Sequence, residues 1–230
     1  MPITVITGSA SGIGAATRSA LEAAGHVVIG VDLRDADVVG DLSSPHGRAR
    51  VLAGVSAELE ARGGGRLDGL LPALRQGQDP SAVVISSVAS SQLSWDRNPL
   101  AAALEAGDEA AAGAIVDGAG DKGGQLAYAG SKNAVTVAVR RRAPEWGRAG
   151  VRLNTVAPGA VETPLLQAGL QDPRYGQAIR DFIAPIARRA RPEEIAAMVA
   201  YLMGPHAGFI HGAQFFVDGG VDAMMRPTQF

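Results

Sequence analysis

The first fourteen residues constrain the fold of this chain most strongly. A short β-branched apolar run, residues 3–7, leads into a turn with the spacing Gly8-x-x-x-Gly12-x-Gly14, and a helical pattern follows at once. In this order of strand, turn and helix, a glycine motif predicts dinucleotide binding. Gly8 would form the tight turn, Gly12 would let the backbone approach a pyrophosphate, and Gly14 would allow close helix–strand packing. A glycine-rich turn without a ligand is the alternative, and the flanking elements favour the cofactor.

Composition narrows the class of protein. A chain of 230 residues with 47% hydrophobic content can bury one core, which predicts a single domain over residues 1–230. A net charge of -2 and the absence of a basic patch beyond residues 140–142 argue against nucleic-acid binding. The lack of cysteine excludes disulfides and a cysteine nucleophile. The sequence shows no signal segment and no apolar run of transmembrane length, so we expect a cytoplasmic protein without a membrane partner.

An acidic residue follows the second predicted strand. Residues 26–31 form an apolar run that ends at Asp32, where a carboxylate that binds the adenosine ribose should fall. Such a carboxylate repels a 2′-phosphate and so predicts NAD rather than NADP, although the neighbouring Arg34 could receive that phosphate. A short third strand, residues 38–42, makes Asp41 and Leu42 candidates to contact the adenine ring.

The connection between the next two predicted strands is too short for a parallel crossover. A helix from about Pro45 to residue 63 precedes strands at 67–71 and 82–86, and only ten residues, including two prolines, connect these strands. A parallel crossover needs about a dozen residues or more. Either the strands are not parallel neighbours, or the chain lacks a segment. Residues 71–75 look like the end of a helix without a beginning, which favours a missing segment between Leu70 and Leu71.

The second half of the chain carries the candidate chemistry. Ser87 lies in a run of hydroxyls at the end of a predicted strand, where a ligand-facing residue belongs. Residues 95–124 are rich in alanine and acidic residues and predict a helical insertion. Tyr128 and Lys132 follow, four positions apart on a long predicted helix, so both side chains emerge on one face. A nearby ammonium stabilises a phenolate, so Tyr128 could serve as general acid/base while Ser87 holds the substrate oxygen.

Together these motifs resemble the short-chain dehydrogenase/reductase family over nearly the whole chain. The matching residues are the glycine motif, Tyr128 to Lys132, and the segment from Asn154 through Pro158-Gly159 to Thr163. The resemblance implies an α/β, Rossmann-type doubly wound parallel sheet, with the helical insertion before the Tyr-x-x-x-Lys helix. It implies catalytic Ser87, Tyr128 and Lys132, with Lys132 also binding the nicotinamide ribose. The cofactor-binding residues that we predict are Gly8, Ser11, Gly12, Ile13, Gly14, Asp32, Asp41, Leu42, Tyr128, Lys132, Pro158, Gly159, Val161 and Thr163.

Two departures from the family pattern bear on function. Ser87 and Tyr128 are 41 positions apart, which the insertion explains. The insertion, residues 86–90 and residues 225–230 are similar to bacterial family members that act on 3α-hydroxysteroids and ketones, and this likeness implies an NAD-dependent 3α-hydroxysteroid dehydrogenase and a homodimer. The second departure is the absent Asn-Ala-Gly-type turn with its helix, which should lie between Leu70 and Leu71 and would carry an assisting catalytic asparagine.

Several alternatives remain open at this stage. A broad carbonyl reductase for xenobiotic ketones is one rival, and a dinucleotide-binding protein without turnover is the other if the deletion is real. Trp95 could contact a small-molecule steroid or ketone substrate together with Ser87 and Tyr128, or simply pack. The four histidines show no metal-ligand spacing, and we predict no metal site.

Overall fold

The computed structural model describes residues 1–64 and 74–229. The predicted strand at 67–71 and the proposed break between Leu70 and Leu71 lie outside these ranges. The first range contains β1 (Ile3–Thr7), α1 (Gly12–Ala23), β2 (Val27–Asp32), β3 (Val38–Val39) and α2 (Pro45–Ala61). The second contains β4 (Ser81–Ile85), α4 (Ala101–Ala106), α5 (Glu109–Gly118), α6 (Gly123–Arg148), β5 (Arg152–Pro158), α7 (Pro164–Gln171), α8 (Gly176–Asp181), α9 (Pro192–Met203), β6 (Gln214–Val217) and α10 (Val221–Met225), with short 3-10 turns η1 (Val88–Ser91), η2 (Trp95–Arg97), η3 (Gly120–Lys122) and η4 (Pro205–Ala207).

The described strands form two parallel sheets of three strands each. One has the order β1-β2-β3 and the other β4-β5-β6. Ile3 pairs with Val27 at the start of the first sheet, and Ser81 pairs with Arg152 at the start of the second. Parallel strands with helices on both faces confirm the predicted α/β, Rossmann-type class. Within the described residues, however, the two sheets are not joined into one. Strands β1 and β4 do not pair with each other, and no described strand pairs with both.

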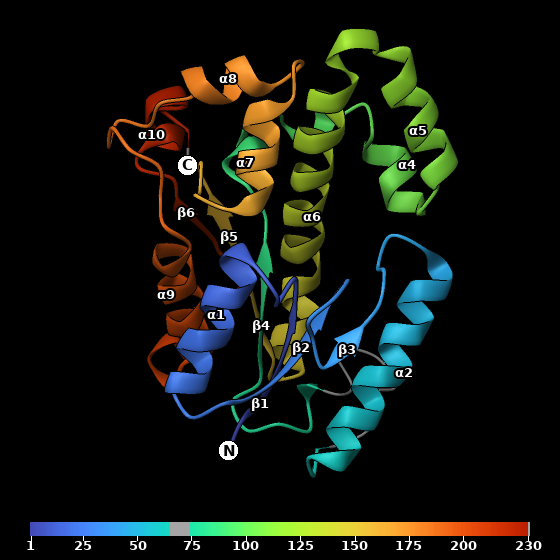
Figure 1. Ribbon diagram of the computed structural model, residues 1–230, viewed down its shortest axis with the longest axis vertical. Coiled ribbons are helices and arrows are strands. Elements are labelled where there is room, and N and C mark those ends of the chain that lie inside the picture. Colours follow the sequence, from blue (N-terminus) through green and yellow to red (C-terminus); the bar gives the residue numbers. More distant parts are fainter. Residues whose placement is uncertain (65–73, 230) are drawn as a thin grey trace.

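Helices α1 and α9 pack against each other and cover both sheets on one face (Figure 1). Val156 of β5 is fully buried against α9, whose Ile195 and Leu202 are also 0% exposed. Helix α6 covers the second sheet on the other face, where Val139 and Trp146 pack on the start of β5. The second sheet therefore lies between α6 and α9. Burial of apolar side chains of this size stabilises a fold by roughly 1.5–3 kcal/mol each.

The helix boundaries follow from local chemistry. Gly25 ends α1 with a φ of +86°, a left-handed conformation that favours glycine. Ser44 caps α2 by accepting a hydrogen bond from the Gly47 N–H at 3.0 Å. Thr163 caps α7 in the same way, through the Leu166 N–H at 3.2 Å. In both helices proline occupies the first turn, where its missing N–H costs nothing.

Some predicted boundaries differ from the structure. The third strand ends at Val39, so Asp41 and Leu42 lie in the following turn rather than on a strand. The long helix begins at Gly123, five residues before Tyr128, because the segment predicted as an insertion runs directly into α6. Helices α4 and α5 confirm helical structure within residues 95–124, whereas α7 and α8 were not predicted. None of the helices in residues 1–64 and 74–229 is long and apolar enough to cross a membrane.

Candidate active site

The carboxyl ends of the strands lie at one end of the molecule. Figure 1 shows α4, α5, α7, α8 and α10 gathered at this end, at the top of the view. The glycine turn leaves β1 here, Ser87 follows β4, and the Thr163 segment follows β5. Ligands of parallel α/β sheets bind at this edge, where the loops that follow the strands converge.

The glycine turn has the close contacts that its sequence predicts. Gly8 adopts a left-handed φ of +72°, and a Cβ added to Gly14 would lie 1.9 Å from the Gly8 carbonyl oxygen. A Cβ on Gly12 would lie 3.0 Å from the Thr163 side chain. Ser11 stands at the N-cap of α1, and its side chain makes no capping hydrogen bond. The first N–H groups of α1 are therefore open to an anionic group.

Asp32 lies beside this turn, as predicted. Its carboxylate accepts hydrogen bonds from the Ala10 N–H at 2.9 Å and from the Leu33 N–H at 2.7 Å. These two bonds hold the carboxylate at the end of β2, next to the glycine turn. Asp41 accepts a hydrogen bond from the Ser43 N–H at 2.8 Å, and Leu42 is exposed. Both lie on the same side of the sheet end and remain candidates for the adenine ring.

Asp37 organises the neighbourhood of Asp32, and the sequence analysis did not single it out. It accepts the Gly30 N–H at 2.7 Å and pairs with Arg18 at 3.0 Å and Arg62 at 3.1 Å. Burial raises the pKa of the Asp37 carboxyl, but the Gly30 N–H and the two guanidinium groups lower it below its usual value. Asp37 thereby ties α1 and α2 to the middle of β2.

The structure brings Lys132 to the end of β4. Its Nζ donates a hydrogen bond to the Ile85 carbonyl oxygen at 3.1 Å, and burial lowers the pKa of its ammonium group. Ser86 donates from its hydroxyl to the Lys132 carbonyl oxygen at 3.2 Å, and it bonds the Thr136 hydroxyl at 2.8 Å. These contacts fix the Lys132 turn of α6 against the strand that Ser87 follows.

Ser87 and Tyr128 occupy different environments. Ser87 is buried, and its Oγ accepts the Ala89 N–H at 3.2 Å as it caps η1. Tyr128 is 51% exposed, one helical turn before Lys132 on the same face of α6. No hydrogen bond joins Tyr128, Lys132 and Ser87 to one another in the described structure. The three predicted catalytic residues thus lie on adjacent elements, without direct contact between their polar atoms.

Two buried asparagines that the sequence analysis missed hold this region together. Asn133 donates to the carbonyl oxygens of Ser90 at 3.0 Å and Leu93 at 2.8 Å. Asn98 donates to the Gly130 carbonyl oxygen at 3.0 Å and to Asn133 Oδ1 at 3.2 Å. The segment after Ser87 is therefore bonded to α6 next to Tyr128. The adjacency of Asn133 to Lys132 is the only local signal of this role.

The segment after β5 is held by backbone contacts. The Gly159 N–H donates to the Val217 carbonyl oxygen at 3.1 Å, and a Cβ on Gly159 would lie 2.9 Å from Asp218 Cα. Val161 is buried and forms a parallel bridge with Ala190. Together with Pro158 at the end of β5, these contacts bring Val161 and Thr163 to the carboxyl edge of the sheets, beside the glycine turn.

Trp95 does not join the predicted site. Its ring lies under the Arg141 guanidinium, 5.0 Å from the ring centroid, and Arg141 also pairs with Glu105 of α4. Arg141 follows Tyr128 by thirteen residues, which is about 20 Å along a helix. This geometry favours packing of η2 on α6 for Trp95 and gives no support to contact with the substrate.

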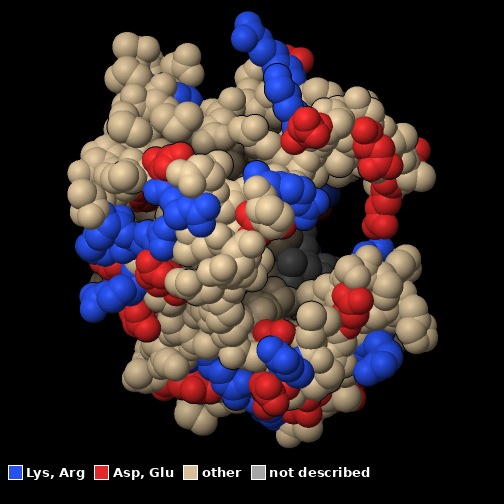
Figure 2. Space-filling view, turned by 45° about the horizontal axis from the view of Figure 1, so that its top comes forward, with Lys and Arg blue, Asp and Glu red and all other residues tan. Residues whose placement is uncertain are grey.

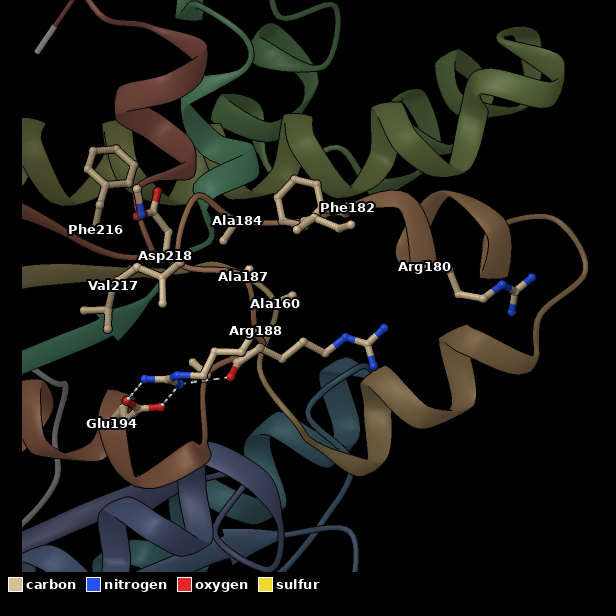
Figure 3. A pocket seen from close by; sticks show the side chains of 16 residues that line it. Ala160, Arg180, Phe182, Ala184, Ala187, Arg188, Glu194, Phe216, Val217 and Asp218 are labelled. Atoms are coloured by element: carbon tan, nitrogen blue, oxygen red, sulfur yellow. Dashed lines mark hydrogen bonds and ion pairs between the residues drawn. The ribbon is translucent and has the colours of Figure 1, made fainter.

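A cavity of about 610 Å³ lies apart from the predicted catalytic residues (Figure 3). Its walls come from residues 180–190 and 216–220, and Phe182 and Phe216 contribute aromatic rings. Arg188 donates twice to the Glu194 carboxylate, at 2.7 Å each, and these bonds lower the pKa of Glu194 to about 2. Ser87, Tyr128 and Lys132 do not line this cavity.

A second hollow lies between α2 and the α4–α5 pair. Figure 2 shows it between the upper and lower parts of the molecule, and an Arg48–Glu109 contact at 3.4 Å joins the two parts. Among the described residues no group of three or more His, Asp or Glu side chains could hold a metal ion. The carboxyl edge of the sheets thus brings together the uncapped N-terminus of α1, the Asp32 carboxylate, the Tyr128 phenol and the Lys132 ammonium group.

Comparison with known proteins gives the class. The family model described as Enoyl-(Acyl carrier protein) reductase matches residues 110–222. A 3-alpha-hydroxysteroid dehydrogenase/carbonyl reductase of Comamonas testosteroni is 56% identical, and the alignment covers 100% of both chains. A levodione reductase of Leifsonia aquatica is 30% identical over 96% of this chain and 94% of the relative. The chain belongs to the short-chain dehydrogenase/reductase family.

Solved structures agree with this assignment. The 3-alpha-hydroxysteroid dehydrogenase of Pseudomonas sp. B-0831, solved as a complex with NADH, has a TM-score of 0.90 and 46% sequence identity. The match covers 99% of this chain and 100% of that one. A levodione reductase structure, 24% identical with a TM-score of 0.73, shares the fold.

Proposed function

We propose that this chain is an NAD-dependent oxidoreductase that interconverts 3α-hydroxysteroids and 3-ketosteroids. The observation that carries the reaction type is the placement of Tyr128 and Lys132 on one face of α6, beside the strand that Ser87 follows. The substrate class rests on the name of the Comamonas testosteroni relative. That name also includes carbonyl reductase, so reduction of other ketones is the nearest alternative substrate range.

The residues at the carboxyl edge fit a bound dinucleotide. The tight packing of Gly14 on Gly8 leaves the first turn of α1 open to phosphates, and Asp32 is positioned for ribose hydroxyls. Ser9 Oγ is buried without a hydrogen-bond partner in the described structure, beside the same turn. NAD, when bound, supplies the hydride acceptor. The Pseudomonas sp. B-0831 enzyme was solved with NADH, which supports this choice of cofactor.

Each catalytic residue has a distinct task in this proposal. Tyr128 takes the proton from the substrate hydroxyl during oxidation and returns it during ketone reduction. The Lys132 ammonium, close by on the same helix face, favours the phenolate form of Tyr128. Ser87 donates a hydrogen bond from its hydroxyl to the substrate oxygen and keeps its proton. Asn98 and Asn133 are positioning residues, because they hold the Ser87 segment against α6.

The proposed break in the chain has support from the alignment. The comparison with the Comamonas testosteroni relative spans 257 positions, and this chain has 230 residues, so at least 27 positions hold no residue of this chain. We place the missing segment between Leu70 and Leu71, where the connection between the predicted strands is too short. A single dehydrogenase domain over residues 1–230, a homodimer and a cytoplasmic location complete the proposal.

A second candidate function is dinucleotide binding without turnover. The observation that favours it is the Lys132–Ile85 hydrogen bond, because it directs the ammonium to a backbone carbonyl of β4. A Lys132 held in this way stabilises a Tyr128 phenolate less well. The two candidates share the cofactor and differ in the chemical step.

A test with matched tyrosine variants separates the candidates. Purified protein is mixed with NAD and a 3α-hydroxysteroid, and NADH formation is followed by absorbance. Tyr128→Phe should still bind NAD and should lower kcat by about 100-fold or more. Tyr201→Phe, on the exposed side of α9, is the control and should keep the full rate. Cofactor binding without NADH formation in the unmodified protein would support the second candidate and contradict the first.

A further inference from the structure

The turn that follows Ser87, η1, is bonded to three different elements. On the α6 side, Asn133 donates to the Ser90 carbonyl oxygen at 3.0 Å. From β6, the side-chain amide of Gln214 donates to Ser90 Oγ at 2.7 Å. Helix α10 also packs on η1 and bonds it through the Asp222 carboxylate. Each of the three elements thus holds η1 through one side chain.

The contact with α10 is a short hydrogen bond between Ser91 and Asp222. The Ser91 hydroxyl lies 2.5 Å from Asp222 Oδ1 and 2.9 Å from the Val88 carbonyl oxygen. A hydroxyl has one proton to donate, and a carboxylate is a stronger acceptor than a neutral carbonyl group. The Ser91 proton is therefore directed to Asp222, across 131 positions of the sequence.

Asp222 is held in place by both its backbone and its side chain. Its N–H donates to Oδ2 of Asp218, the residue after β6, at 2.7 Å. Its carboxylate accepts hydrogen bonds from Arg226 Nε at 2.9 Å and Arg226 Nη2 at 3.0 Å. The preceding residue, Val221, is 0% exposed. The Asp222 carboxylate is therefore a fixed acceptor for the Ser91 hydroxyl.

The position of Ser91 bears on Ser87 because both belong to one short turn. Ser87 is the N-cap of η1, and Ser91 is its last residue. The Ser90 N–H donates to the Ser87 carbonyl oxygen at 2.9 Å, and Ser87 Oγ accepts the Ala89 N–H at 3.2 Å. A 3-10 turn advances through only three residues, so a shift of Ser91 moves the backbone groups that orient the Ser87 hydroxyl.

We propose that α10 positions the Ser87 hydroxyl through the Asp222–Ser91 hydrogen bond, which makes Asp222 a positioning residue for the reaction. Asp222 complements Asn133, which holds the same turn from α6. Misplacement of a reacting or orienting group by about 1 Å can cost about 100-fold in rate. The effect on turnover rests on the proposed function, whereas the attachment of η1 to α10 does not.

Variants that break the bond from either side test the proposal. Asp222→Ala removes the acceptor and Ser91→Ala removes the donor, and each should lower kcat for 3α-hydroxysteroid oxidation about tenfold, with the Kd for NAD unchanged. Asp222→Asn keeps an amide oxygen that can accept the Ser91 O–H, so it should retain more of the rate than Asp222→Ala. Glu58→Ala removes an ion pair of the same i,i+4 spacing, with Arg62 on α2, and is the matched control with full kcat.

Two double variants distinguish positioning from general damage to the fold. Ser91→Ala combined with Asp222→Ala should be no slower than either single variant, because both substitutions break the same bond. In a Ser87→Ala background, Asp222→Ala should cause no further loss of kcat, because the hydroxyl that it positions is gone. A tenfold loss that persists in that background, or a normal kcat in both single variants, would overturn the proposal.

Hydrogen exchange measures the attachment of η1 to α10 without reference to turnover. Peptides that cover residues 87–93 should exchange faster in Asp222→Ala and Ser91→Ala than in the unmodified protein or in Glu58→Ala. Unchanged exchange would show that α10 does not hold η1, and the proposal would fall. Faster exchange in both variants of a protein that forms no NADH would support the attachment and contradict only the proposed function.

Discussion

Gly12 lies directly against Thr163, so that a Cβ on Gly12 would approach Thr163 Cγ2 to 3.0 Å. Gly12 belongs to the turn after β1, and Thr163 caps the helix that follows β5. The contact joins the two halves of the predicted cofactor site, each of which comes from a different sheet. Gly12 also has a φ of +52°, which a side chain disfavours.

Gly12→Ala should therefore weaken NAD binding. The added methyl must displace Thr163 and adopt a strained φ, so we expect at least a tenfold higher Kd, equivalent to about 1.4 kcal/mol. Isothermal titration with NAD measures the effect. Gly113→Ala is the control, because a Cβ at this position in α5 meets no atom within 4 Å. If both variants bind NAD with equal affinity, the glycine turn does not form the cofactor site.

Asp32→Ala should remove the preference for NAD over NADP. The carboxylate repels a 2′-phosphate and would bond the ribose hydroxyls, and a charged hydrogen bond contributes about 1.5–3 kcal/mol. Asp32→Asn removes the negative charge but keeps the local hydrogen bond, since an amide oxygen can still accept the Ala10 N–H. Both variants should lose discrimination in kcat/KM measured with the two cofactors. A preference retained by Asp32→Ala would assign the selection to other residues.

Asn98→Ala should destabilise the protein by about 2–3 kcal/mol. The substitution leaves Asn133 Oδ1 without its donor in a buried position, and the Leu100 N–H loses its acceptor. The Gly130 carbonyl oxygen, inside α6, loses the additional hydrogen bond from Asn98. Urea unfolding measures the change in free energy. Because Asn98 positions the Ser87 segment, kcat should fall as well, while cofactor affinity stays constant. A stable variant with normal turnover would show that this network is dispensable.

Asp37→Asn should change the dependence of stability on pH. The pKa of Asp37 lies below that of an unfolded aspartate, about 3.9, so its ion pairs stabilise the protein above that pH. This contribution is lost as the pH falls through the folded-state pKa. Asp37→Asn should thus be less stable than the unmodified protein near neutral pH, and the difference should shrink as the medium becomes acidic. Thermal unfolding between neutral and acidic pH provides the measurement, and a constant difference would contradict the prediction.

The sequence predicts the parts of this site that depend on local spacing. The turn from Gly8 to Gly14 and Asp32 at the end of β2 are found where expected, because each is fixed by a single strand–helix unit. Tyr128 and Lys132 share a helix face for the same reason. The fold class can also be predicted from the sequence, since alternating strands and helices lead to parallel sheets.

Contacts between distant segments could not be predicted. Asn98 and Asn133 are 35 positions apart, and only the packing of η2 against α6 gives their side chains a common buried site. Asp37 lies in a loop whose role depends on arginines from α1 and α2. The sequence predicts a later start for α6 because Gly123 and Gly124 are poor helix formers. In the structure a Cβ on Gly124 would clash with the Tyr175 side chain, a contact between distant segments that requires a small residue there. For Trp95 the sequence leaves substrate contact and packing open, and its contact with Arg141 of α6 is another long-range feature that the sequence does not reveal.

The strands of each sheet come from one continuous part of the chain. Residues 3–39 supply β1, β2 and β3, and residues 81–217 supply β4, β5 and β6. One buried cluster, with Ile29 and Val55, belongs wholly to the first part, and another, with Val139 and Leu153, belongs wholly to the second. A break in the polypeptide between residues 64 and 74 would separate the described strands of one sheet from those of the other, and the packing of α1 on α9 would still connect the two fragments. The protein is therefore suited to expression as two separate fragments, and their reassembly would report the proximity of two partners fused to them.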